Sequence, residues 1–370
     1  MTQTISFPGL GLAFDVNPVL FNLPSFLGGI PIYWYGVIVS LGFLCGALYF
    51  FARTKEFAID SERSADVLLG GIICAIVGAR LYYVLFSRDS YRGDLMRIFN
   101  IREGGLAIYG GVAAAFLSGA LLCKLRKVKV LPLLDLASIS LLLGQAIGRW
   151  GNFVNTEAFG ANTDLPWGMT SNGIAQYLAY NAEALKKVNM AVSPTMPVHP
   201  TFLYESLWCL LGFVLLGLFA KRRRFDGQIL LMYLGWYGLG RAFIEGLRID
   251  SLLLGSLRIS QLVAILCVIA SVVIILLVFS RIRREGDDTY LLPYRDTADG
   301  QRVIAGTFYA KKGSANEVGD ANEVGDGADA EVEVDEDAQA AADAEADEET
   351  SEEVGVESDS GDAVAEPEEE

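Results

Sequence analysis

A short segment that mixes arginine, asparagine and glutamate with glycine is the part of the chain best suited to chemistry. It runs from Gly144 to Gly160, GQAIGRWGNFVNTEAFG, at the end of an apolar stretch. Arg149 stands where a membrane helix would leave the hydrocarbon, and Asn152 and Glu157 follow within eight residues. A charged Arg near a bilayer costs roughly 2.5–3.5 kcal/mol, and Arg binds phosphate through two parallel hydrogen bonds. The segment predicts a site for an anionic group at a membrane surface; an Arg that only reaches lipid headgroups is the simpler alternative.

A second segment, QILLMYLGWYGLGRAFIEGLRID, carries charged residues inside an apolar run. At 100° per residue, four side chains fall within about 80° of one helix face: Tyr237, Arg241, Glu245 and Arg248. Charged residues in membrane helices rarely face lipid, so this face predicts a site in the protein interior. Two readings stay open: the Arg241–Glu245 pair only neutralises itself, or Glu245 positions an Arg241 that keeps its charge for a ligand.

Polar side chains also stand at the ends of other apolar runs, where we expect them at the same depth in the membrane as Arg149. They are Tyr35 in IYWYG, Arg80 in VGARLYY, Tyr109 in GGLAIYGG, and His199, Tyr204 and Glu205 in HPTFLYES. Aromatic residues at a membrane interface, headgroup anchoring by Arg80 and close helix packing at the glycines are simpler explanations for these positions.

Composition indicates a membrane protein with an unusual C-terminal end. The mean hydropathy is +0.37, and 52% of the 370 residues are hydrophobic. From Asp287 onward the chain has 28 Asp and Glu against 4 Lys and Arg, and ANEVGD occurs twice in succession. Dense like charge with few apolar residues predicts disorder over 313–370, within an acidic tail that spans 286–370. A single histidine and five cysteines without ligand spacing indicate that no metal site is present.

Seven apolar runs of about 20 residues predict an all-α integral membrane protein with seven transmembrane helices. The runs are 32–52, 66–86, 105–123, 131–149, 201–220, 228–247 and 259–280. The connections on one side hold 14 Lys and Arg against 8 on the other, which predicts an outside N-terminus and a cytoplasmic C-terminus. Residues 1–285 are then the membrane domain, and 150–198 forms an ordered extracytoplasmic cap with a helix around 174–188.

In these segments the chain resembles the prolipoprotein diacylglyceryl transferases of bacterial membranes. GRWGNFVNTEAFG is similar to the family pattern GRxGNFxNxExxG, and IYWYG, GGLAIYGG, HPTFLYE and YGLGRAFIEGLR are similar to its other blocks in the same order. The resemblance covers about residues 20–285. It implies transfer of diacylglyceryl from phosphatidylglycerol to the lipobox cysteine of a prolipoprotein, the first step of lipoprotein maturation. It further implies location in the bacterial cytoplasmic membrane, with the active site outside. The expected partners are the two substrates and the membrane, with no nucleic acid, metal or cofactor.

From the resemblance and the patterns together we predict the site residues. The expected catalytic residues are Arg149, Arg241, Tyr109 and Glu245. The expected substrate-binding residues are Arg149, Asn152, Glu157, Tyr35, Tyr237 and Arg80. Many members carry histidine where this chain has Tyr109, and often where it has Tyr33. The identity of a general base therefore stays open.

Two other classes of function are compatible with parts of the sequence. A transporter or channel for an anionic solute would use Arg149 and Arg241 to line its path, but the seven runs show no two-fold repeat. A seven-helix sensor would use the acidic tail as an effector contact, but leaves the glycine–arginine–asparagine segment unexplained.

Overall fold

The computed structural model describes most of the first 310 residues. The described residues are 2–87, 91, 95–100, 104–187, 190–249, 253–254, 257–286 and 290–310. The chain divides into two units, Met1–Lys312 and Gly313–Glu370. The second unit lies outside the described residues, so the disorder expected over 313–370 stays a prediction.

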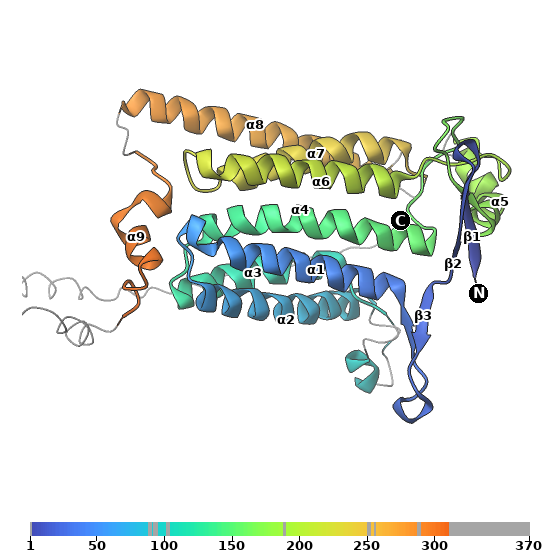
Figure 1. The fold of residues 1–370 in the computed structure, drawn as a ribbon, viewed down its shortest axis with the longest axis horizontal. Helices are drawn as coiled ribbons and strands as arrows, with labels where there is room; N and C mark the ends of the chain where they lie inside the picture. The colour runs from blue at the N-terminus through green and yellow to red at the C-terminus, as the bar shows by residue number, and fades with distance from the viewer. Residues whose placement is uncertain are drawn as a thin grey trace, which may run out of the picture. The chain divides into compact units, whose positions relative to one another are not determined.

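Long helices laid side by side make up most of the first unit (Figure 1). They are α1 (Trp34–Arg53), α2 (Ser61–Phe86), α3 (Ile108–Arg126), α4 (Val130–Asn155), α6 (Thr201–Phe219), α7 (Gln228–Leu247) and α8 (Ile259–Glu285). Each coincides with one of the expected apolar runs, with ends that differ by a few residues. The main helix pairs are α1 with α4, α2 with α3, α4 with α6, and α7 with α8. Small residues permit the first of these pairs: a Cβ on Gly42 would lie 2.9 Å from the carbonyl oxygen of Gly144.

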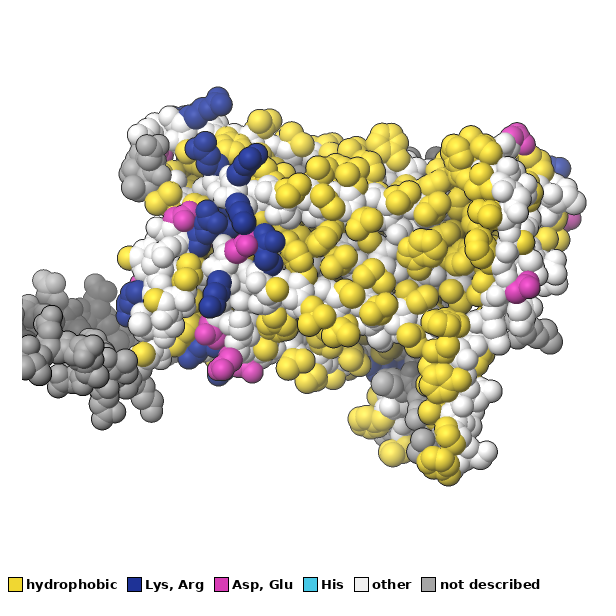
Figure 2. Space-filling model, in the orientation of Figure 1, with side chains coloured by type: hydrophobic (Ala, Val, Ile, Leu, Met, Phe, Trp, Pro, Cys, Tyr) yellow, Lys and Arg dark blue, Asp and Glu magenta, His cyan; other side chains and the backbone are white. Residues whose placement is uncertain are grey.

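Within the described residues, six of these helices are long and apolar enough to cross a membrane, and α7 is not among them. Helix α7 carries Arg241 and Glu245 in its last two turns. Figure 2 shows apolar side chains over the flank of the bundle. Exposed leucines of this kind include Leu117 (75% exposed) and Leu218 (73%). An apolar flank of this extent is expected of a multi-pass membrane protein.

A small α/β unit, which we call the cap, lies at one end of the bundle (Figure 1). It contains β1 (Gln3–Phe7), β2 (Leu12–Val16), β5 (Thr170–Ser171) and α5 (Asn172–Lys187). Strand β1 pairs antiparallel with both β2 and β5. Its core consists of Ile5, Phe7, Phe159, Met169, Ile174, Leu178, Leu185, Val198, Phe202 and Ile249. The helix expected around 174–188 is present as α5, whereas the contribution of the N-terminal strands was not expected.

The remaining elements are short, and the fold is mostly helical rather than all-α. Two further sheets are hairpins of β3 (Val19–Asn22) with β4 (Pro31–Tyr33) and of β6 (Leu253–Leu254) with β7 (Leu257–Arg258). The short 3-10 helices are η1 (Pro8–Leu10), η2 (Ser25–Leu27), η3 (Thr54–Phe57), η5 (Leu95–Phe99), η7 (Ala220–Arg222) and η8 (Tyr294–Asp296).

The opposite end of the bundle is basic, and residues 290–310 pack against it (Figure 2). This segment contains η8 and α9 (Ala298–Ile304). The backbone N–H of Tyr294 donates to Asp226 Oδ2 at 2.8 Å, and the guanidinium of Arg63 lies 3.9 Å from the ring centroid of Tyr309. We expected 286–370 to be mostly disordered. The structure gives residues 290–310 contacts with the loop that holds Asp226 and with α2, and the expected disorder of the remainder stays a prediction.

Candidate functional site

The centre of the site is a buried carboxylate on α6 that contacts three arginines. Glu205 lies in the second turn of α6, and its side chain is 6% exposed. Its Oε1 lies 2.6 Å from Nη1 of Arg241 on α7 and 3.9 Å from Nη1 of Arg248. Its Oε2 is in close contact with Nε of Arg149 on α4. One carboxylate therefore joins three elements that are distant in the sequence.

A second carboxylate holds Arg241 from its own helix. Oε2 of Glu245 lies 2.6 Å from Nη2 of Arg241, in the i,i+4 relation. The side chain of Glu245 is 2% exposed, whereas that of Arg241 is 21% exposed, and that of Arg149 is 23% exposed. The carboxylates are thus buried while the arginine side chains are partly exposed. This arrangement contains both the self-neutralising pair and an arginine that is available to a ligand.

The loop after α4 turns Glu157 back towards the helix end. Thr156 and Ala158 have φ of 49° and 55°, a left-handed conformation that non-glycine residues adopt at a cost. Between them, Oε1 of Glu157 accepts hydrogen bonds from Nδ2 of Asn152 at 2.9 Å and of Asn155 at 3.4 Å. Asn152 Oδ1 in turn accepts from Nη1 of Arg149 at 3.5 Å. The expected site residues of this segment therefore form one connected polar network.

Backbone hydrogen bonds fasten this loop to the two other helices of the site. The N–H of Gly160 donates to the His199 carbonyl at 2.9 Å, and that of Ala161 to the Leu247 carbonyl at 2.8 Å. The hydroxyl of Thr201 donates to the carbonyl of Ala158. Glycine is required at 160, because a Cβ there would lie 2.8 Å from Cβ of His199. The loop thereby fixes the end of α4 against the start of α6 and the end of α7.

Tyrosines lie on two sides of the network. The ring of Tyr35 on α1 covers Gly151, where a Cβ would be 2.8 Å from Cδ2 of the tyrosine. Tyr237 on α7 is half-buried, and its ring stacks on that of Tyr233 with centroids 5.8 Å apart. Gln145 of α4 donates to the hydroxyl of Tyr233 at 3.1 Å. Close approach of the Tyr35 ring therefore explains the glycine at position 151 of the motif.

The single histidine belongs to a neighbouring hydrogen-bonded group at the start of α6. Nδ1 of His199 lies 3.2 Å from the hydroxyl of Tyr204, which also accepts from Nε1 of Trp167 at 2.8 Å. Burial lowers the pKa of His199 below its usual value near 6.5. The imidazole is therefore neutral at physiological pH.

The structure does not bring Arg80 or Tyr109 into the arginine–carboxylate cluster. Arg80 is buried and donates to five backbone carbonyls, those of Arg97, Ile98, Asn100, Gly104 and Gly105. This use of its guanidinium is structural, because it holds the segment before α3 against α2. Tyr109 lies in the first turn of α3 and is 69% exposed. Substrate contact by either residue stays a prediction.

Glu205 is the site residue that sequence reasoning did not select. The segment HPTFLYES placed Glu205 at the expected depth of the site. His199 and Tyr204 in the same segment were equally suitable as site residues, so the sequence did not single out Glu205. Its partners Arg149 and Arg241 lie on other helices, so no local spacing signals the contact. One general signal could have identified Glu205: a carboxylate in an apolar run is expected to pair with arginines on other membrane helices.

Membrane-length helices and a buried arginine–carboxylate cluster define an integral membrane protein with a site suited to an anionic group. A family model described as prolipoprotein diacylglyceryl transferase matches residues 18–277. Three similar proteins, each named phosphatidylglycerol–prolipoprotein diacylglyceryl transferase, extend this match. The protein from Finegoldia magna is 44% identical over 247 residues, which are 66% of this chain and 91% of the relative. That from Clostridium botulinum is 39% identical over 270 residues (73% and 99%), and that from Bacillus cereus is 39% identical over 274 (74% and 97%). The chain belongs to the prolipoprotein diacylglyceryl transferase family.

Proposed function

We propose that this protein transfers the diacylglyceryl group of phosphatidylglycerol to the lipobox cysteine thiol of a prolipoprotein. Family membership supports this reaction, and the observation that carries it is the convergence of three arginines on Glu205. Phosphatidylglycerol carries one phosphodiester negative charge. The partly exposed guanidinium-bearing side chains of Arg149 and Arg241 supply positive charge for that ligand.

Arg149 and Arg241 are assigned to the phosphate. Both side chains are partly exposed, and carboxylates hold them in place: Glu205 pairs with both, and Glu245 pairs with Arg241 as well. Donors fixed in this way stabilise charge that develops on a leaving group without reorganising during the reaction. In the reaction, the thiol sulfur forms a bond to the glycerol carbon, the C–O bond to phosphate breaks, and glycerol phosphate leaves with the electron pair. The two cationic groups also favour the thiolate form of the attacking cysteine.

The other residues of the network are assigned to geometry. Asn152 and Glu157 fix the helix end that carries Arg149, and Glu245 orients Arg241. Tyr35 and Tyr237 line the space around the arginines. Tyr109 is proposed to contact the glycerol portion of the lipid, since it shares the expected outer level, and the general base is left unassigned. Arg80 is assigned to holding the segment before α3, and its contact with substrate stays a prediction.

The proposal includes a membrane topology. We infer that α7 is a seventh span, because its polar face meets Glu205 and its other contacts are with α4, α6 and α8. The basic end of the bundle is assigned to the cytoplasm of a bacterial cell, together with the C-terminus. The N-terminus, the cap around 150–198 and the site are then outside, and residues 1–285 form the membrane catalytic domain.

Transfer of label tests the function directly. The purified protein is incubated with phosphatidylglycerol labelled in its acyl chains and with a lipobox peptide, and label on the cysteine is measured. We expect kcat/KM to fall at least about 10²-fold in Arg149→Lys and Arg241→Lys, because a point charge does not reproduce the bidentate fork. Arg126→Lys is the control, since Arg126 pairs with Asp66 on an exposed surface between α2 and α3. Absence of transfer by the wild type, or anion flux in vesicles without transfer, would contradict the proposal.

A further inference from the structure

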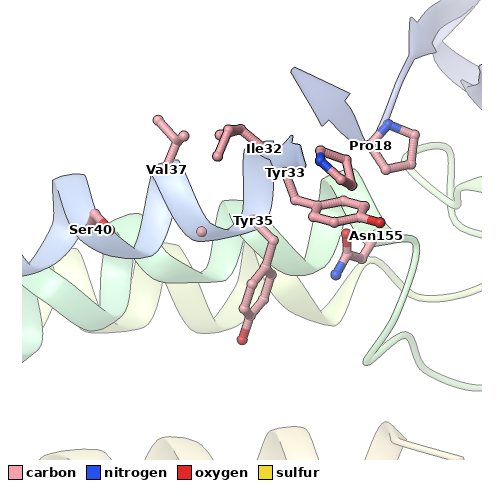
Figure 3. A pocket seen from close by; sticks show the side chains of 9 residues that line it. Pro18, Ile32, Tyr33, Tyr35, Val37, Ser40 and Asn155 are labelled. Carbon is pink, nitrogen blue, oxygen red and sulfur yellow. The ribbon is translucent and has the colours of Figure 1, made fainter. Parts of the chain in front are cut away.

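An open groove lies against the first turns of α1, beneath the β3–β4 hairpin (Figure 3). Its volume is about 800 Å³. Its lining residues are Pro18, Pro31, Ile32, Tyr33, Tyr35, Gly36, Val37, Ser40 and Asn155. The prolines and Ile32 form its end at the β3–β4 hairpin, and Gly36, Val37 and Ser40 continue it along the flank of α1. Most of the lining is apolar, as is expected of a surface that faces lipid or an apolar segment.

The groove lies on a face of α1 that the protein's own packing leaves uncovered. Gly42 and Gly46 face α4, where a Cβ would lie 2.9 Å and 3.0 Å from backbone oxygens. Gly36, Val37 and Ser40 lie roughly 100–200° around the helix from that face. A Cβ on Gly36 would meet no atom within 4 Å among the described residues. The glycine at 36 is therefore not explained by contacts within this chain.

Ser40 adds a second unexplained feature on the same face. Three other helix serines, Ser118, Ser138 and Ser140, donate to the carbonyl four residues earlier. Ser40 is exposed and makes no such hydrogen bond in the described part of the chain. Gly36 and Ser40 stand at i and i+4, the spacing that lets a second helix approach closely and accept or donate a hydrogen bond. An acyl chain requires neither feature.

A chain of hydrogen bonds links the groove to the arginine site. Asn155 lines the groove and donates to Oε1 of Glu157 at 3.4 Å. The same oxygen accepts from Asn152, which contacts Arg149. Tyr35 lines the groove and covers Gly151 of the motif. A segment seated in the groove would therefore end beside the residues assigned to the reaction.

We propose that this groove holds the apolar helix of the acceptor prolipoprotein's leader, which places the cysteine that follows that helix beside Arg149. The inference rests on the proposed function, since it names the position of one of its two substrates. Apolar leader segments of 7–15 residues span roughly 10–22 Å as helices. This length suits a helix that lies along α1 and ends at the level of Asn155. Contact through Gly36 and Ser40 aligns it, and the β3–β4 hairpin limits how far it extends.

Crosslinking tests the occupant. A benzophenone amino acid replaces Val37 in the full-length protein, with Leu117 on α3, 75% exposed, as the control position. On irradiation with a full-length prolipoprotein in phosphatidylglycerol vesicles, we expect the Val37 variant to crosslink to the acceptor polypeptide and the Leu117 variant not to. Crosslinks to phospholipid alone at Val37, or equal crosslinking at both positions, would overturn the inference.

Kinetics with two acceptors gives an independent test. Gly36→Leu fills the groove without an internal clash and removes a helix glycine, and Gly119→Leu is the matched control because a Cβ at 119 also meets open space. For Gly36→Leu we expect KM for the full prolipoprotein to rise about tenfold, in line with a lost helix–helix contact. KM for phosphatidylglycerol and transfer to a short lipobox peptide without the apolar segment are expected to change less than about twofold.

The outcomes separate the two proposals. If the wild type labels neither acceptor, the proposed function is wrong. If the wild type labels both acceptors and Gly36→Leu leaves both unchanged, the groove is not the leader site. If Gly36→Leu raises KM for phosphatidylglycerol with both acceptors, the groove holds a lipid chain, and the inference is again wrong.

Discussion

Replacing Glu205 by glutamine tests whether one carboxylate organises the site. The change keeps the size of the side chain and removes its charge, so Arg149 and Arg241 lose the carboxylate that they share. Breaking a buried ion pair costs about 3–5 kcal/mol. Because Arg149 and Arg241 are 23% and 21% exposed, water screens part of this loss, and we expect stability to fall by about 2–3 kcal/mol.

The catalytic loss is expected to exceed what stability alone explains. Glutamine presents one acceptor oxygen and one NH2 group, and the NH2 group cannot accept from the second arginine. One of Arg149 and Arg241 then loses its fixed position, and a misplaced group costs roughly 10²-fold in rate. Glu205→Asp keeps the charge but is shorter by one methylene, so it reaches one arginine at a time. We expect it to lower kcat by about tenfold.

The assay combines thermal unfolding in detergent with initial rates of diacylglyceryl transfer. Glu56→Gln is the control, because Glu56 forms an ion pair of 2.6 Å with Arg53 at the opposite end of the bundle. An unchanged kcat in Glu205→Gln would refute the positioning role. A lower KM for phosphatidylglycerol with unchanged kcat would show that the carboxylate competes with phosphate, which also contradicts the reasoning.

Four further changes test other parts of the structure. Arg80→Gln should lower the free energy of unfolding by about 3 kcal/mol, and with it the unfolding midpoint, because several of the five hydrogen bonds from Arg80 to carbonyls are lost. An unchanged midpoint together with a raised KM for lipid would instead indicate that Arg80 binds the ligand. Tyr109→Phe should lower the transfer rate by about tenfold or less, whereas a proton relay would give roughly 10²- to 10⁴-fold. Truncation after Ala310 should leave stability and rate unchanged, but truncation after Arg284 should lower the unfolding midpoint, since it removes the contacts of 290–310. His199 has a lowered pKa, so the folded state binds fewer protons than the unfolded state below about pH 6.5. Wild-type stability should therefore fall from pH 7.5 to 5.5 by more than that of His199→Asn, and equal slopes would contradict this assignment.

The helices and one half of the site could be predicted because their signals are local. Apolar runs of membrane length locate each long helix, and i,i+4 spacing places Arg241 beside Glu245, as the structure shows. The link from Arg149 through Asn152 to Glu157 also lies within nine residues of sequence. Periodicity and spacing carry such contacts directly.

Contacts between distant segments could not be predicted in the same way. Glu205 contacts its arginines across two helix interfaces. Which side chains meet there depends on how the helices pack and not on spacing within one segment. Arg80 was expected at headgroups or substrate, but the carbonyls it binds become available only when the segment before α3 folds back over α2. Order in 290–310 depends likewise on loops more than 60 residues away, such as the one that holds Asp226.

The pairing of β1 with β5 sets an order of assembly during synthesis. Ile5 pairs with Ser171 and is fully buried in the cap core. Strand β1 therefore cannot pair with β5 until the ribosome has synthesised the chain beyond Ser171. At 5–20 residues per second, the interval is roughly 8–33 s. During this time the β1–β2 hairpin lacks its third strand and remains open to chaperones or to mispairing.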